Sequence, residues 1–194
     1  MDENMLQSME PLEQPRRIKR GFMSFKCSSP ITFPDRCCRD LLIQATLDRQ
    51  VQSLAPSTWT DFCSSDAYFS FEAVMGGKRC LIEVCDATNA KPFEPPNRYD
   101  LGLTLSRTAI LAEPRLSSAR TIWACREMQV PLQFQFELIR FLTPHEKGLR
   151  LSDLESLLNL ELSKWISQAP ALVCRGTLQV ESVSRINGQT RLSL

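Results

Sequence analysis

Glu83 and Cys85 stand two positions apart at the end of an apolar run, and two further carboxylates, Glu72 and Asp86, lie close by in the sequence. Residues two apart on a β-strand project from the same face, so the carboxylate of Glu83 and the thiol of Cys85 are expected to point the same way. Carboxylate oxygens bind magnesium, which neutralises charge during phosphodiester cleavage, whereas a thiol is a poor ligand for so hard a cation. The pair therefore offers only part of what metal-dependent hydrolysis needs.

The histidine and the cysteines limit other kinds of chemistry. His145 is the single histidine, which excludes any mechanism that needs two and argues against a histidine-based zinc site. Its neighbours Pro144 and Gly148 predict an exposed turn. The eight cysteines occur singly or as the pair Cys37-Cys38, mostly inside apolar runs and without CxxC spacing. Reduced, mostly buried thiols are therefore favoured over zinc ligation.

A helix and a hairpin are expected to position these groups. Apolar residues recur at i, i+3, i+4 and i+7 from Cys38 onward, which predicts a helix that begins at Asp35. Residues 67–75 and 78–85 are rich in β-branched and aromatic side chains and are separated by Gly76-Gly77, so they predict a hairpin in the core sheet. A proline-rich connection follows, with at most a short helix at residues 99–105, and then a third strand at residues 108–112.

The chain changes to a helical character beyond Pro114. Residues 116–128 and 132–142 predict two helices, and residues 149–151 predict an extended segment. Ser152, with Glu155 three residues later, predicts the cap of another helix, a further helical run starts at Ser163, and Asn187-Gly188 predicts a hairpin turn. Three helices followed by a two-stranded hairpin is the order of a winged helix-turn-helix domain.

The predicted hairpin resembles the core of a known nuclease family. Residues 68–85 contain Tyr68, Ser70-Phe71, an apolar strand, a Gly-Gly turn, the basic pair Lys78-Arg79, a second apolar strand and Glu83-Val84-Cys85. This order is similar, without gaps, to the PD-(D/E)xK core of TnsA, the endonuclease subunit of heteromeric transposases. Residues 108–113, 116–131 and 172–178 resemble the last core strand of that family, the helix into its C-terminal domain and its helix-to-wing junction. The resemblance implies an α/β fold, with a restriction-endonuclease-like mixed sheet core followed by a small winged helix-turn-helix domain.

The resemblance also identifies the positions that are catalytic in the family, and most of them have changed. The Pro-Asp pair falls on Ser70-Phe71, the acidic residue on Glu83, the lysine on Cys85, and a further glutamate of the upstream helix on Cys38. Only Glu83 keeps the required side chain. The resemblance therefore implies a degenerate motif with no catalytic residues, no bound metal and no cofactor.

Two interpretations of Glu83 stay open at this point. It is either a vestigial metal contact or a solvent-facing strand end beside Arg79. Glu72 and Asp86 offer replacement ligands if the register slips by one residue. Such a slip turns the strand over and moves Phe71 to the opposite face, which makes Glu72 a poor substitute for the missing aspartate.

Local groups of cations are the candidates for DNA binding, because 23 Lys and Arg against 22 Asp and Glu give a net charge of only +1. The candidates are Arg16, Arg17, Lys19 and Arg20 in an N-terminal arm, Lys164 and Arg175 on the expected recognition helix, and Arg185 and Arg191 on the wing. A solvated charge run is the alternative explanation of the arm.

Protein docking is the alternative role of the C-terminal domain. Pro170 interrupts its candidate recognition helix, which then either restarts at this proline or departs from the family pattern. The apolar stripe Leu162, Trp165 and Ile166 suits core packing or a protein partner.

The composition is that of a globular protein. The 194 residues, 43% hydrophobic and 23% charged, allow one good core or two small ones. We expect a mobile lead-in at residues 1–15, a degenerate nuclease-like domain at 16–113 and a winged-helix-like domain at 114–194. No apolar run approaches the ~20 residues that span a bilayer, and the acidic N-terminus is unlike a signal peptide, so we expect no membrane contact and a cytoplasmic location.

Three functions remain as hypotheses. The first is a non-catalytic TnsA-like subunit that acts by DNA and protein contacts, with a DDE-type transposase and a regulatory ATPase of the AAA+ class as the partners that the resemblance implies. The second is an active magnesium-dependent endonuclease that cuts transposon ends with Glu83 and displaced ligands such as Glu72 or Asp86. The third is a protein-interaction component or inhibitor of a nucleic-acid-targeting complex.

Overall fold

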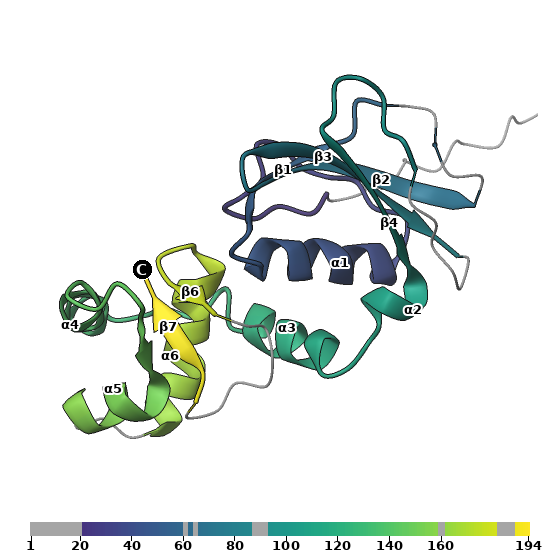
Figure 1. The fold of residues 1–194 in the computed structure, drawn as a ribbon. Helices are drawn as coiled ribbons and strands as arrows, with labels where there is room; N and C mark the ends of the chain where they lie inside the picture. The colour runs from purple at the N-terminus through teal and green to yellow at the C-terminus, as the bar shows by residue number, and fades with distance from the viewer. Residues whose placement is uncertain (1–20, 60–61, 64–65, 87–92, 159–161, 182–188) are drawn as a thin grey trace, which may run out of the picture.

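A four-stranded mixed sheet and a three-stranded sheet organise the protein (Figure 1). The computed structural model describes residues 21–59, 62–63, 66–86, 93–158, 162–181 and 189–194. The larger sheet has the order β1 (Val51–Pro56), β2 (Ala67–Met75), β3 (Lys78–Cys85) and β4 (Leu101–Ser106). Strands β1 to β3 are antiparallel neighbours and β4 runs parallel to β3, so the predicted α/β class with a mixed sheet is confirmed.

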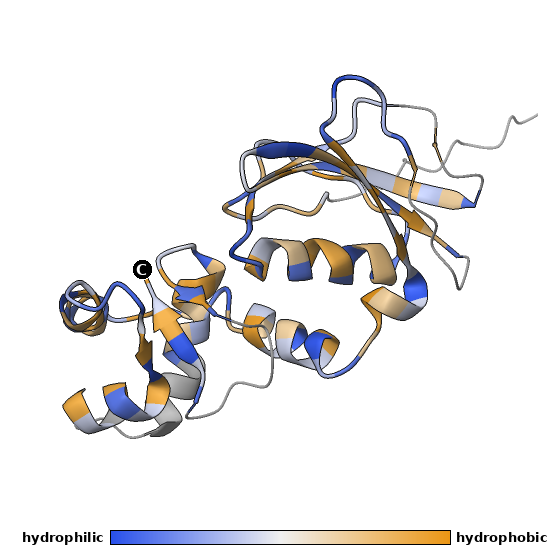
Figure 2. Cartoon of the chain, in the orientation of Figure 1, coloured by the Kyte–Doolittle hydropathy of each residue, from blue (hydrophilic) through white to orange (hydrophobic). Residues whose placement is uncertain are grey.

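Helix α1 (Arg36–Leu47) lies along one face of this sheet (Figure 1). Asp35 caps it, because its carboxylate accepts a hydrogen bond from the backbone N–H of Cys38 at 2.9 Å. The apolar stripe of α1 is buried with the inner face of the strands, and Figure 2 shows hydrophobic residues concentrated along both. The predicted helix from Asp35 is therefore confirmed.

The predicted hairpin is also confirmed, with the strand limits that the sequence indicated. Gly76 and Gly77 turn the chain with φ values of 57° and 78°, a conformation that glycine adopts without steric cost. Strand β1 was not predicted from the sequence. It follows α1 after a short turn at Asp48 and pairs with the edge of β2 that does not pair with β3.

Two predictions for the connection after β3 are wrong. Residues 99–105 were expected to contain at most a short helix, yet Leu101–Ser106 is the parallel strand β4. Residues 108–112 were expected to be a strand, yet Arg107–Ile110 forms the short helix α2. The Ser106 hydroxyl ends the strand and starts the helix by accepting a hydrogen bond from the backbone N–H of Ala109 at 3.2 Å.

The C-terminal part contains four helices and the smaller sheet. Its elements are α3 (Arg115–Ala124), α4 (Leu132–Leu142), β5 (Leu149–Arg150), α5 (Leu151–Leu158), α6 (Leu162–Cys174), β6 (Gln179–Val180) and β7 (Arg191–Ser193). Helix α4 has its predicted limits, whereas α3 ends at Ala124 instead of Met128.

Ser152 and Pro170 differ from expectation in this part. Ser152 does not cap α5, which already begins at Leu151, and its hydroxyl donates to the carboxylate of Asp153. Helix α6 continues through Pro170, so it does not restart there. The predicted turn at Asn187-Gly188 lies outside the described residues.

Helix α3 lies between α1 and α6 and connects the two parts (Figure 1). Asp40 of α1 is only 2% exposed, and both of its carboxylate oxygens accept hydrogen bonds from the guanidinium of Arg120 on α3. The expected division at residues 113 and 114 stays a prediction. Among the described residues, no helix combines the length and the apolar character needed to cross a lipid bilayer.

Candidate functional site

The degenerate nuclease positions lie on opposite faces of the four-stranded sheet. Residues that pair directly across two antiparallel strands project from the same face. Phe71 pairs with Ile82, while Glu83 pairs with Ser70. Since side chains alternate along a strand, Phe71 faces α1 and Glu83 faces the other side, so the structure does not bring these two positions into one cleft.

Cys38 and Phe71 belong to the hydrophobic core between α1 and the sheet. Both are fully buried, and the ring of Phe71 stacks on that of Phe69 with 5.8 Å between centroids. Burial raises the pKa of the Cys38 thiol to about 12. This thiol therefore stays protonated at neutral pH and packs as a small apolar group instead of binding a cation.

Glu83 lies on the outer face under the segment that follows β1. Its side chain is fully buried, and Oε1 accepts a hydrogen bond from the backbone N–H of Cys63 at 2.7 Å. The interpretation of Glu83 as a solvent-facing strand end is therefore wrong, because the β1–β2 connection covers it. Cys85 shares this face with Glu83, as expected, and is also buried.

Glu72 also lies on the face of Glu83, contrary to the expectation that only a register slip would bring it there. In the observed register it pairs with Leu81, two positions from the pair of Ser70 with Glu83. The gapless comparison with the nuclease motif assigns the aspartate position to Phe71. In the observed sheet, its neighbour Glu72 shares a face with Glu83 instead. The oxygen-bearing side chains of this face include Ser70, Glu72, Glu83 and Thr104.

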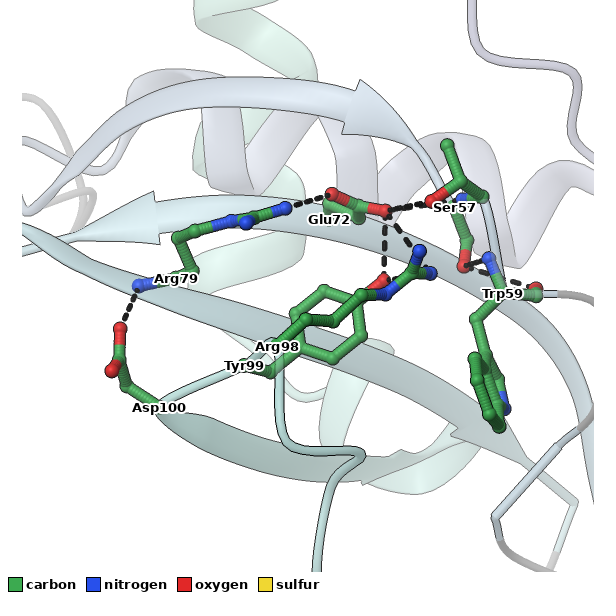
Figure 3. Close-up of polar contacts among 8 residues, drawn as sticks. Ser57, Trp59, Glu72, Arg79, Arg98, Tyr99 and Asp100 are labelled. Atoms are coloured by element: carbon green, nitrogen blue, oxygen red, sulfur yellow. Dashed lines mark hydrogen bonds and ion pairs between the residues drawn. The ribbon is translucent and has the colours of Figure 1, made fainter.

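Glu72 is the centre of a polar network that was not predicted from the sequence (Figure 3). Its Oε1 accepts hydrogen bonds from the Tyr99 hydroxyl at 2.7 Å and from the backbone N–H and hydroxyl of Thr58 at 3.1 and 3.0 Å. Arg79 and Arg98 approach the same carboxylate at 3.5 and 3.7 Å. These contacts tie both long connections, after β1 and before β4, to the outer face of the sheet.

Burial and hydrogen bonding act in opposite directions on Glu72. Burial raises the pKa of its carboxyl, but the hydrogen bonds from Thr58 and Tyr99 and the charge of Arg98 outweigh it, so the pKa lies below its usual range. The guanidinium of Arg98 also lies over the rings of Tyr99 and Trp59, at 4.8 and 5.5 Å from their centroids. Glu72 is thus an ionised carboxylate whose acceptor positions are occupied by protein donors.

A second network joins the start of α1 to the ends of the central strands. The guanidinium of Arg107 donates to the Asp35 carboxylate at 2.6 Å and to the Tyr68 hydroxyl at 3.1 Å, and lies 3.6 Å from the Asp86 carboxylate. Asp86 is therefore paired with an arginine on the helix side of the sheet. Arg107 was not predicted as its partner, because their proximity depends on the parallel pairing of β3 with β4.

The carboxylates near the degenerate motif do not fit a nuclease-type magnesium site. Magnesium prefers near-octahedral coordination by oxygen ligands. The Glu83 carboxylate accepts from Cys63, that of Glu72 is surrounded by its own donors, and Phe71 lies on the other face. In the described part of the chain, no three His, Cys, Asp or Glu side chains are grouped so that they could hold a metal ion.

The cysteines and the histidine are placed as the sequence predicts. None of the eight cysteines forms a disulfide, and six are buried, with Cys63 exposed and Cys125 partly exposed. His145 lies in an exposed turn after α4, where its Nδ1 lies 2.9 Å from the carbonyl oxygen of Phe141.

Only two of the candidate DNA-binding cations have described side chains. Arg175 is exposed just after α6 and donates to the carbonyl oxygen of Met128. Arg191 on β7 lies 3.8 Å from the carboxylate of Glu181 and donates to the carbonyl oxygens of Lys147 and Gly148. Lys164 belongs to α6, but the structure does not describe its side chain. The remaining candidates lie outside the described residues: Arg16, Arg17, Lys19, Arg20 and Arg185.

Comparisons of this chain with protein-family models, with curated proteins and with solved structures find no match.

Proposed function

We propose that this protein is a non-catalytic TnsA-like subunit that acts by DNA and protein contacts in a transposase or a related nucleic-acid-processing complex. The implied partners are a DDE-type transposase and an AAA+ regulator. A role on DNA in such a complex places the subunit in the cytoplasm. The observation that carries the non-catalytic part is the separation of Phe71 and Glu83 onto opposite faces of the sheet.

The contacts of the carboxylates support the same conclusion. A catalytic magnesium needs carboxylates that are free to bind it and that converge on one point. Glu72 and Glu83 share a face, yet each is already hydrogen-bonded to the chain segment that covers it. The outer face is therefore built as a structural layer that attaches two connections to the sheet.

The arrangement of the C-terminal elements supports a winged-helix module. Three helices, α4, α5 and α6, precede the antiparallel strands β6 and β7, and β5 completes the sheet by pairing with β7. This is the order that the sequence predicted for a winged helix-turn-helix domain. Such a domain suits a subunit whose role is to bind instead of to cut.

Protein contacts are favoured by the surface of α4. Leu132 and Phe136 are one helical turn apart and each is 70% exposed. Exposed aromatic and aliphatic side chains on one helix face are typical of a protein interface. This observation also favours the third hypothesis above, a protein-interaction component or inhibitor of a nucleic-acid-targeting complex.

Association with duplex DNA tests the proposal. We expect the full chain to bind a fluorescently labelled duplex in an anisotropy titration, with an affinity that falls as salt rises by about 0.9 log units per log unit of salt for each phosphate contact. A protein-interaction component without DNA contacts would give no anisotropy change even at low salt, and that result would overturn the DNA part of the proposal.

A further inference from the structure

Two adjoining hollows lie beside the turn after α1, and the first of them also reaches the C-terminal part. The first has a volume of about 290 Å³ and is lined by Lys26, Arg49, Gln52 and residues of the segment after α6. The second has a volume of about 590 Å³ and extends along the hairpin turn to Lys78. Arg49 and Gln52 line both hollows, so together they form one surface groove, here called the Arg49 groove.

The charged residues that line the Arg49 groove are all positive. They are Lys26, Arg49 and Lys78, and among the described residues no Asp or Glu lines either hollow. The acidic residue next to Arg49 in sequence, Asp48, has its carboxylate 3.6 Å from Arg115. A groove that collects cations without carboxylates concentrates positive potential and attracts anions.

Acidic residues lie near both ends of the Arg49 groove. At the Lys78 end, the carboxylate of Asp100 accepts a hydrogen bond from the backbone N–H of Arg79 at 2.8 Å, and Asp100 precedes the lining residue Leu101. Arg49 also lines a smaller hollow of about 80 Å³, whose lining includes Glu146 and Glu181. The carboxylate of Glu181 lies 3.8 Å from the guanidinium of Arg191, which offsets part of its charge. Between these borders, the described residues that line the groove from Arg49 to Lys78 include no carboxylate, so this lining is the part that attracts anions.

Arg49 is free to bind a ligand. Its side chain is exposed at the turn between α1 and β1, and it forms no ion pair or hydrogen bond with the rest of the described chain. Lys26 differs, because its ammonium donates to the carbonyl oxygen of Asp48 at 2.6 Å and fixes the turn that presents Arg49. An unpaired guanidinium on a fixed turn is well suited to a bidentate contact with a phosphate.

The neutral lining suits the same ligand. Gln52 is held by the backbone N–H of Gly77, which donates to its Oε1 at 3.3 Å. Phe25, which is 48% exposed, lies against Gly176, where an added Cβ would stand 2.5 Å from the ring. The groove thus has fixed walls of amide and aromatic groups beside its cations, as polyanion-binding surfaces do.

We infer that the Arg49 groove binds the phosphodiester backbone of DNA, with Arg49 and Lys78 as phosphate contacts. The inference rests on the proposed DNA-binding function and assigns it to a surface made of the α1–β1 turn and the β2–β3 hairpin turn. This surface lies at the opposite end of β3 from Glu83 and Cys85. It includes none of the cations that the winged-helix comparison suggested.

The test compares Arg49→Ala, Lys78→Ala and the matched control Arg36→Ala in the full chain. Arg36 is also exposed but begins α1, at the far end of the helix from Arg49. We expect Arg49→Ala to weaken binding to a labelled duplex by about tenfold and to reduce the salt slope by about 0.9, with a similar change for Lys78→Ala. Arg36→Ala should retain the wild-type affinity and slope.

The outcomes separate the two claims. If the wild-type chain binds the duplex and Arg49→Ala binds with the same affinity and salt slope, the groove inference is overturned while the proposed function stands. If the wild-type chain does not bind duplex DNA at low salt, the DNA-binding function fails and the groove inference fails with it. Circular dichroism of the three variants checks that each is folded, which we expect because all three side chains are exposed.

Discussion

Restoring the aspartate of the nuclease motif at position 71 is expected to destabilise the protein. The side chain of Phe71 is fully buried between the sheet and α1 and stacks on Phe69. We expect Phe71→Asp to lower the free energy of unfolding by more than about 4 kcal/mol, since it removes a core ring and buries a carboxylate. Denaturant unfolding measures this decrease, and Phe71→Leu is the control, with a cost of about 1 kcal/mol. Equal stability of the two variants would show that position 71 does not face the core.

Glu72 is expected to stabilise the protein in a pH-dependent way. At neutral pH, Glu72→Gln should lower the free energy of unfolding by about 1–2 kcal/mol, because it weakens several charge-assisted hydrogen bonds. Burial raises the pKa of this carboxyl, but the hydrogen bonds lower it by a larger amount. The pKa in the folded state is therefore below the pKa in the unfolded state. The stabilisation is therefore present above the unfolded pKa and is lost as the pH falls through the folded pKa.

The measurement is urea unfolding of wild type and Glu72→Gln between pH 7 and pH 3. The difference between them should shrink below about pH 4.5, the ordinary pKa of glutamate. Glu127→Gln is the control, because the side chain of Glu127 is 81% exposed and pairs with the neighbouring Arg126 on the surface. A difference that grows as the pH falls would contradict the assignment of Glu72 as an ionised hydrogen-bond acceptor.

Residue types identify the motif positions that have changed, but not how the side chains at these positions lie. The substitutions at Cys38, Phe71 and Cys85 are visible in the sequence alone. The face of each strand position is not, because it depends on the cross-strand register, which no motif specifies. The Glu72 network could not be predicted either, since Thr58 and Tyr99 reach Glu72 from two irregular connections that have no periodic pattern.

Among the elements, α1 and α3 are joined by a buried ion pair in addition to their apolar contacts. Asp40 is 2% exposed and both of its oxygens accept from Arg120. We expect Arg120→Ala to lower the free energy of unfolding by about 3 kcal/mol, because it leaves a buried carboxylate without its partner.

A double-mutant cycle with Asp40→Asn isolates this pair in thermal or denaturant unfolding. The double variant should be more stable than the sum of the two single effects indicates, since the neutral amide no longer needs a cation. Strictly additive effects would mean that Arg120 and Asp40 do not stabilise each other.

Elements with a strong local signal were predicted and those that depend on tertiary pairing were not. The cap at Asp35, the glycines at 76 and 77 and the periodicity of residues 132–142 specify α1, the hairpin and α4 directly from the sequence. Residues 101–106 were misassigned because a parallel strand gains its hydrogen bonds from β3, far back in the sequence. The apolar residues after Ser106 were then assigned to a strand, although the strand had already ended.

At the scale of the whole molecule, the N-terminal basic arm is a second possible route to DNA. Arg16, Arg17, Lys19 and Arg20 are close together in the sequence and lie outside the described residues. If they bind phosphates, changing all four to alanine should weaken duplex binding and reduce the salt slope by about 0.9 for each phosphate that is no longer neutralised. Anisotropy titrations at several salt concentrations measure both quantities. An unchanged slope would leave the arm as a solvated run of charge.

A cleavage assay distinguishes a subunit that binds DNA without cutting it from an active endonuclease. Purified wild-type protein and the variant Glu83→Ala are incubated with supercoiled DNA in magnesium or manganese, and nicked and linear products are measured over time. We predict no cleavage above buffer for either protein, because Phe71 and Glu83 face opposite sides of the sheet and the Glu83 carboxylate is held by Cys63. Metal-dependent cleavage by the wild type that disappears in Glu83→Ala would contradict the account and identify the protein as an active endonuclease.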